Sequence, residues 1–84
     1  MRKARRIDET FVGLNWTARK LNLDRKLVYY WAVKFKLRTF KFKGVRYVES
    51  EDMLFLIINL NARYQINQNN LEEAKEKVTE TIPT

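Results

Sequence analysis

The chain has 84 residues, which is enough for one small domain with a single core and too short for a catalytic domain plus a second module. It contains neither cysteine nor histidine. Disulfides and thiolate chemistry are therefore excluded, and the commonest metal ligand and general base are missing. The composition thus predicts neither an enzyme nor a cofactor or metal site. The apolar fraction of 45% is sufficient for a packed core.

Basic residues outnumber acidic ones by 17 to 10, which gives a formal net charge of +7. Residues 1–48 hold most of the cations and only three of the carboxylates. A charge of this sign favours a polyanionic partner, although electrostatic attraction alone carries no sequence information. We expect the polyanion to meet the first half of the chain.

The first ten residues form a basic arm in this interpretation. Such an arm can become ordered on phosphates or in a minor groove, and a merely solubilising tail explains the charge equally well. No apolar run of signal-peptide or membrane-spanning length is present, so a cytoplasmic, DNA-associated location without a membrane partner is expected. The cations of the arm are Arg2, Lys3, Arg5 and Arg6.

A short apolar stretch, residues 11–14, predicts one strand-like turn packed against the core. Asn15 can cap a first helix over residues 16–21, because its side chain can accept from unpaired amides of the first turn. Arg19 and Lys20 are expected to face outward from this helix. Asn22 is a plausible left-handed residue between this helix and the next.

The second helix is expected to start after Asp24, a good N-cap, and to have an apolar back and a basic, aromatic front. Arg25 and Lys26 occupy its first turn, where cations oppose the helix dipole. Phosphates docked at the helix start would explain them, and an ordinary solvated face remains the alternative. The predicted back comprises Leu27, Val28, Trp31, Ala32 and Phe35. The predicted front comprises Arg25, Lys26, Tyr29, Tyr30, Val33 and Lys34.

Residues 39–43 alternate with period two, and residues 45–48 form a matching run across Gly44, so this segment predicts a β-hairpin. The cations of the hairpin are Lys41, Lys43 and Arg46. A hairpin without a binding role is possible. Cations at its tip directly after a basic helix are what a DNA-binding wing requires.

The next helix is expected to be capped by Ser50, with acidic residues in its first turn. The acidic cluster over residues 49–52 has no partner acids in a matching spacing, which argues against a metal or nuclease site. Residues 53–60 are apolar on nearly every side of the predicted helix. The core-facing side is predicted to comprise Met53, Ile57, Leu60 and Tyr64. The apolar residues that this side does not need are Leu54, Ile58 and Phe55. Surplus apolar surface suggests a partner helix, most simply in a homodimer through helix 53–60.

The last predicted helix covers residues 71–78 and starts with a capping box between Asn70 and Glu73. Only Leu71, Ala74 and Val78 can pack, and the chain is expected to fray from residue 79. The predicted organisation is a basic arm over 1–10, a domain over 11–66, and a polar helix with a frayed tail over 67–84.

Residues 11–58 resemble the winged helix-turn-helix of the MerR family and the related excisionase-like domains. Residues 24–31 lie where that family shows a capping Ser and a Thr-Leu-Arg-Tyr-Trp type run. Residues 44–53 are similar to its wing and following helix start, typically Gly-Tyr-Arg-Tyr-Tyr-Ser-Glu-Glu-Asp-Leu. The resemblance implies a mostly α fold with a small β-hairpin wing.

The resemblance also implies that the second helix enters the major groove and that the wing grips flanking phosphates. Arg25, Lys26, Tyr29 and Tyr30 would then take the first role, and Lys43 and Arg46 the second. The sequence departs from the family where Tyr29 replaces an Arg, Phe35 a Gly and Gly13 a capping residue. The family's long dimerising coiled coil and effector domain have no counterpart, so no small-molecule effector is expected.

The leading hypothesis is a small sequence-selective protein that binds double-stranded DNA, as a transcription regulator or an excisionase-like architectural factor of a phage or plasmid. One alternative is an RNA-binding or ribosome-associated protein, because basic charge interleaved with aromatic residues also suits stacking on unpaired bases. Another is a protein-interaction module that uses the apolar helix 53–60.

Overall fold

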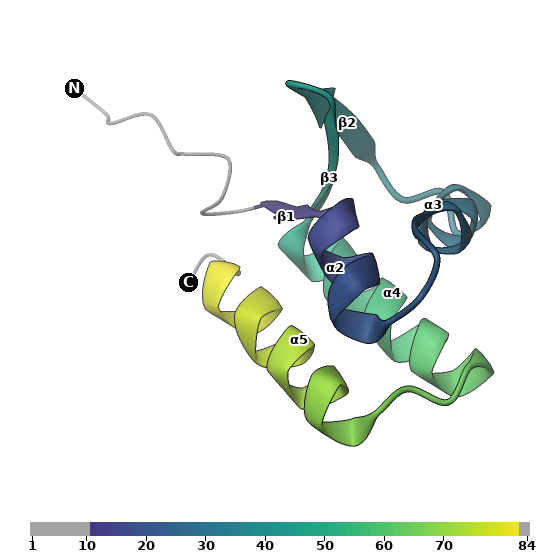
Figure 1. Cartoon of the computed structure of the whole chain (residues 1–84). Helices are drawn as coiled ribbons and strands as arrows, with labels where there is room; N and C mark the ends of the chain where they lie inside the picture. Colours follow the sequence, from purple (N-terminus) through teal and green to yellow (C-terminus); the bar gives the residue numbers. More distant parts are fainter. Residues whose placement is uncertain (1–10, 83–84) are drawn as a thin grey trace.

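The computed structural model describes residues 11–82 and shows a mostly helical chain with one small antiparallel sheet (Figure 1). This confirms the predicted combination of helices with a small hairpin. The predicted arm over residues 1–10, with Arg2, Lys3, Arg5 and Arg6, lies outside the described residues, as do residues 83–84. The elements are β1 (Phe11–Gly13), α2 (Leu14–Leu21), α3 (Arg25–Lys34), β2 (Thr39–Phe42), β3 (Val45–Glu49), α4 (Ser50–Arg63) and α5 (Gln68–Thr81).

The sheet has the order β1-β3-β2, and both neighbouring pairs are antiparallel. Strand β3 is central, so Val48 pairs with Val12 of β1 on one side and with Thr39 of β2 on the other. Lys43 and Gly44 join β2 to β3 with φ angles of 51° and 80°. Two consecutive positive φ angles are typical of the tight hairpin turns that match the twist of the strands, and Gly adopts them without steric cost.

One hydrophobic core joins the sheet to all four helices. The last helix, α5, packs against α4 and α2 and also approaches β1 (Figure 1). The helix after residue 67 therefore shares its core with residues 11–66, and Leu71, Ala74 and Val78 are buried as predicted. The other buried apolar residues are Val12, Leu14, Ala18, Leu21, Val28, Ala32, Val48, Met53, Leu56, Ile57, Leu60 and Ile66.

Helices α2 and α3 end in the same way, each with a left-handed residue that is not glycine. Asn22, at φ 58°, follows α2, as predicted, and the amide of Leu23 donates to the carbonyl of Ala18 over 2.9 Å. Lys36, at φ 59°, follows α3, and the amide of Leu37 donates to the carbonyl of Ala32 over 2.9 Å. These six-to-one bonds are those of the Schellman motif and satisfy carbonyls that the helix leaves free.

The predicted cap of the first helix is wrong. Helix α2 starts at Leu14 with Gly13 in the N-cap position, so Asn15 lies inside the helix. No side chain caps this helix, and the hydroxyl of Thr17 donates to the carbonyl of Gly13 over 3.1 Å. The strand β1 runs directly into the helix, so Asn15 is the second residue of α2 and lies two residues beyond the N-cap position.

The predicted caps of the last two helices are also wrong. Ser50 is the first residue of α4 and is buried, where its hydroxyl is hydrogen-bonded to that of Thr81 in α5. Helix α5 begins earlier than predicted, with Asn67 as the N-cap, and the amide of Asn70 donates to its side chain over 3.2 Å. The same helix continues to Thr81 instead of fraying from residue 79. Tertiary contacts between α4 and α5 hold this last turn.

Candidate functional site

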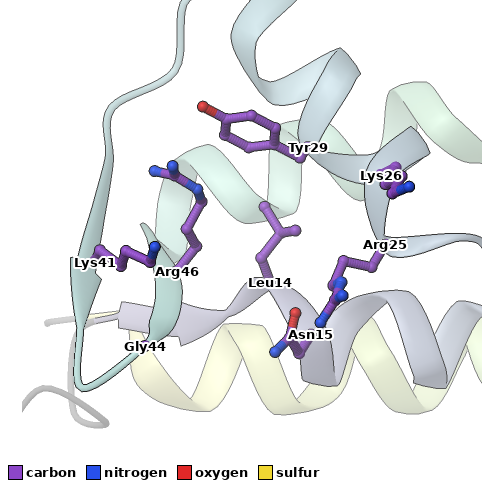
Figure 2. Close-up of a pocket in the computed structure, with 8 residues that line it drawn as sticks. All are labelled: Leu14, Asn15, Arg25, Lys26, Tyr29, Lys41, Gly44 and Arg46. Carbon is purple, nitrogen blue, oxygen red and sulfur yellow. The ribbon is translucent and has the colours of Figure 1, made fainter.

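A hollow of about 330 Å³ lies between the start of α3, the start of α2 and the β2–β3 hairpin. Figure 2 shows the side chains that line it, with Arg25, Lys26 and Tyr29 contributed by α3 and Lys41 and Arg46 by the hairpin. The structure thus brings together five residues that the sequence singled out in two separate segments. The full lining is Leu14, Asn15, Arg25, Lys26, Tyr29, Lys41, Gly44 and Arg46.

The charged residues that line this hollow are all cationic. Four of its lining residues are cations, and among the described residues that line it none is acidic. Lys41 and Arg46 are direct cross-strand partners, although like charges opposite one another destabilise an antiparallel pair. An anion between them and the start of α3 would relieve this repulsion.

The start of α3 has a matching arrangement. The carboxylate of Asp24 accepts a hydrogen bond from the amide of Lys26 over 2.8 Å, which confirms the predicted N-cap. The first turn of α3 contains no acidic residue, and Arg25 and Lys26 are both exposed. Their positive charges lie at the positive end of the helix dipole, which is unfavourable. A bound anion would interact favourably with the two side chains and with the helix dipole.

Arg46 connects the hairpin to α3. Its guanidinium carbon lies 4.4 Å from the centre of the Tyr29 ring, a cation–π distance. Tyr29 is half-buried and packs against the core, so the ring is a firm support for the guanidinium. This contact fixes one cation at the mouth of the hollow while its N–H donors stay available.

A second hollow of about 270 Å³ adjoins the first and includes Arg19. Asn15 and Arg25 line both hollows, so the cationic surface continues from the hairpin across the start of α3 to α2. The complete lining of the second hollow is Asn15, Ala18, Arg19, Leu23 and Arg25.

Within residues 11–82, four other predicted site residues lie outside these hollows. Lys43 is exposed in the hairpin turn, with its ammonium 5.5 Å from the centre of the Phe42 ring. Lys34 is exposed in the last turn of α3, and Tyr30 is exposed with its ring edge-on to that of Trp31. Lys20 forms an ion pair with Glu73 of α5. The structure therefore directs Lys20 toward α5.

Sequence reasoning missed that Asn15 lines the hollow and that Arg63 contacts the Trp31 ring. The sequence predicts Asn15 as a helix cap, and the hollow that it lines forms only when the hairpin folds toward α2. The guanidinium carbon of Arg63, in α4, lies 4.0 Å from the centre of the Trp31 ring. The indole N–H of Trp31 donates to the hydroxyl of Tyr64 over 3.0 Å. These residues are distant along the chain, so no local pattern could pair them.

The described residues contain no group of three or more acidic side chains close enough to hold a metal ion. Within the same part of the chain, every helix falls short of the length or the apolar character that crossing a bilayer requires. Comparisons with protein-family models, with curated proteins and with solved structures gave no match.

Proposed function

We propose that this protein binds double-stranded DNA through a winged helix-turn-helix. Helices α2 and α3 would form the helix-turn-helix, and the β2–β3 hairpin would form the wing. The observation that carries the proposal is the convergence of Arg25, Lys26, Lys41 and Arg46 on one hollow without an acidic side chain in its lining. Such a surface suits the phosphates of a nucleic acid backbone.

In this proposal α3 enters the major groove. Arg25 and Lys26 would meet base edges or phosphates near the helix start, where Arg pairs well with guanine. Val33 lies on the exposed side of α3 and would contact a thymine methyl group, with Tyr30 and Lys34 beside it on the same helix. Base contacts from this face would give the protein its sequence selectivity.

The hairpin would hold the phosphates that flank the groove. Lys41 and Arg46 face the hollow, and Lys43 is exposed in the turn. Because Arg46 rests on Tyr29, the wing and α3 would contact neighbouring phosphates as one unit. The role would be that of a transcription regulator or an excisionase-like architectural factor.

Duplex DNA is favoured over single-stranded RNA because most rings are occupied inside the fold. Phe40 lies edge-on to Phe11 and is stacked on Tyr47, with ring centres 4.8 Å and 5.5 Å away. Trp31 contacts Phe35 and the guanidinium of Arg63. Few aromatic faces therefore remain for the base stacking on which single-strand binding depends.

The test is a fluorescence-anisotropy titration of a labelled DNA duplex, with unlabelled single-stranded DNA and hairpin RNA as competitors. The double variant Arg25→Ala with Arg46→Ala should bind the duplex much more weakly. The matched control, Lys75→Ala with Lys77→Ala, removes the same charge from α5 and should bind nearly as well as the unchanged protein. Unchanged affinity of the first variant, or better competition by hairpin RNA, would overturn the proposal.

A further inference from the structure

Helix α4 has an exposed stripe that the proposed DNA contacts do not use. Glu51, Phe55, Ile58 and Ala62 are all exposed, and they follow one another at spacings of four, three and four residues. The side chains of Phe55 and Ile58 are 48% and 52% exposed. Spacings of this kind keep residues on one side of a helix and form the seam along which two helices pair.

The surroundings of the stripe extend its apolar centre. Phe35, at the end of α3, packs edge-on against Phe55 with ring centres 5.4 Å apart. Leu54, the residue before Phe55, is half-buried and packs against the core, so Phe55 and Ile58 are the large apolar side chains of the stripe. Scattered apolar side chains are common on protein surfaces, whereas a contiguous apolar stripe marks an interaction site. The opposite side of α4 is fully used, because Met53, Leu56, Ile57 and Leu60 are buried in the core.

The charges at the two ends of α4 favour a second copy of the same helix as the partner. Its first turn holds Glu51 and Asp52, and its last turn holds Arg63. An antiparallel copy of the same helix would bring acidic first turns next to basic last turns and would align the two helix dipoles favourably. A parallel copy would bring like charges together. Ala62 is small, so the ends of such a pair can approach closely.

We propose that two copies of this chain associate through α4, antiparallel about a two-fold axis between residues 55 and 58. Phe55 of one copy then packs against the partner subunit's Ile58, and Glu51 lies beside the partner subunit's Ala62. Such an interface is isologous, since the same stripe serves both copies. The arrangement involves none of the cations of the hollow and is independent of nucleic acid.

The interface is short, so the association is weak. A pair of helices of this length buries an area at the low end of specific interfaces. A dissociation constant of about 10–100 µM is therefore expected. The dimer should be detected by raising the protein concentration with no DNA present.

The first experiment is sedimentation velocity from about 1 µM to about 500 µM protein, because self-association depends on concentration. Phe55→Ser and Ile58→Ser should each weaken dimerisation at least about tenfold. Val33→Ser and Phe42→Ser are matched controls, since these side chains are 52% and 44% exposed elsewhere on the surface. The controls should leave the monomer–dimer equilibrium unchanged, and circular dichroism verifies that every variant folds.

A second experiment tests the antiparallel register. Ala62→Lys should tighten the dimer about threefold, because the new ammonium faces the partner's Glu51, and Ala62→Glu should weaken it about threefold. In a parallel pair, residue 62 of one copy would face residue 62 of the other. Two like charges would then meet, so both substitutions would weaken association. The two variants differ in sign only for the antiparallel arrangement.

Cysteine cross-linking gives an independent measure, since the natural chain has no cysteine. Mixing Glu51→Cys with Ala62→Cys should give a disulfide-linked heterodimer on mild oxidation. Ala62→Cys alone should not cross-link, because the two sites are about 16 Å apart along the axis at 1.5 Å per residue, beyond the reach of a disulfide.

A chain that stays monomeric up to the highest concentration would overturn the proposal, as would self-linked Ala62→Cys dimers. Equal weakening by Val33→Ser and Ile58→Ser would overturn it too. Variants of the cations that line the hollow can lose DNA binding without changing the results of these dimerisation experiments. The DNA-binding proposal and the dimer proposal can therefore be disproved independently.

Discussion

The guanidinium carbon of Arg46 lies 4.4 Å from the centre of the Tyr29 ring and thereby connects the β-hairpin to α3. The two residues come from elements that are separate in the chain, and both line the cationic hollow (Figure 2). The contact links the hairpin to α3 at the cationic hollow. It is therefore the relationship on which the proposed joint use of wing and helix depends.

A double-mutant cycle measures this contact. Tyr29→Leu and Arg46→Met each remove one partner while keeping most of the side-chain volume. Urea unfolding of the two single variants and the double variant should give a coupling free energy of about 0.5–1 kcal/mol, as for other partly exposed cation–π pairs. Tyr29→Phe retains the ring and should unfold nearly as the unchanged protein does. Additive single-variant effects would show that the contact does not stabilise the fold.

The end of α3 gives a prediction about stability. Lys36 adopts a φ of 59°, a left-handed conformation that is unfavourable for residues with a Cβ. Lys36→Gly should therefore raise the free energy of unfolding by about 0.5–1 kcal/mol, despite the greater flexibility of the unfolded chain. Lys34→Gly removes the same charge from the last helical residue and should lower the free energy of unfolding by about 0.5 kcal/mol, because Gly is a poor helix former. Thermal melts followed by circular dichroism measure both changes.

The last turn of α5 should contribute to folding. The hydroxyl of Thr81 is hydrogen-bonded to that of Ser50 and donates to the carbonyl of Val78 over 2.7 Å. Thr81→Val keeps the shape and loses these bonds, which should lower the free energy of unfolding by about 1 kcal/mol. Thr79→Val, an exposed position in the same turn, is the control and should have little effect. Equal stability of the two variants would show that the last turn of α5 is frayed, as the sequence predicts, and that the Thr81 hydrogen bonds do not stabilise the fold.

The proposed DNA binding should depend steeply on salt. If roughly five to eight phosphates are neutralised, the log–log slope of affinity against salt is about −5 to −7. The double variant Arg25→Ala with Arg46→Ala should reduce the size of this slope by about two, one for each lost phosphate contact. Anisotropy titrations at several salt concentrations give both slopes. A slope near zero would exclude backbone contacts as the source of affinity.

The individual cations should differ in importance. Lys20 is ion-paired with Glu73, whereas Arg25 is exposed and lines both hollows. Arg25→Ala should weaken duplex binding about tenfold. Lys20→Ala should weaken it less than about twofold, since its charge is already engaged by α5. The reverse order would indicate that the DNA surface extends along α2 toward α5.

The sequence alone was sufficient for the features that depend on neighbouring residues. The N-cap Asp24, the left-handed Asn22 and the hairpin around Gly44 were all predicted, and the structure confirms them. Each is decided by the conformational preference of one residue type and by the period of the residues around it. The cations of the hollow were found as well, because both segments are visibly basic.

Where two residues could serve as the cap of a helix, only the tertiary structure decided at which of them the helix begins. The tertiary structure also decided which partner each polar side chain contacts. Asn15, Ser50 and Asn70 are all suitable cap residues, yet β1 leads straight into α2, Ser50 meets Thr81, and Asn67 takes the cap of α5. Local cap preferences differ by small free energies, and buried contacts between distant segments outweigh them. The hollow arises in the same way, since the packing of the hairpin against α2 and α3 brings charges from separate segments to one place.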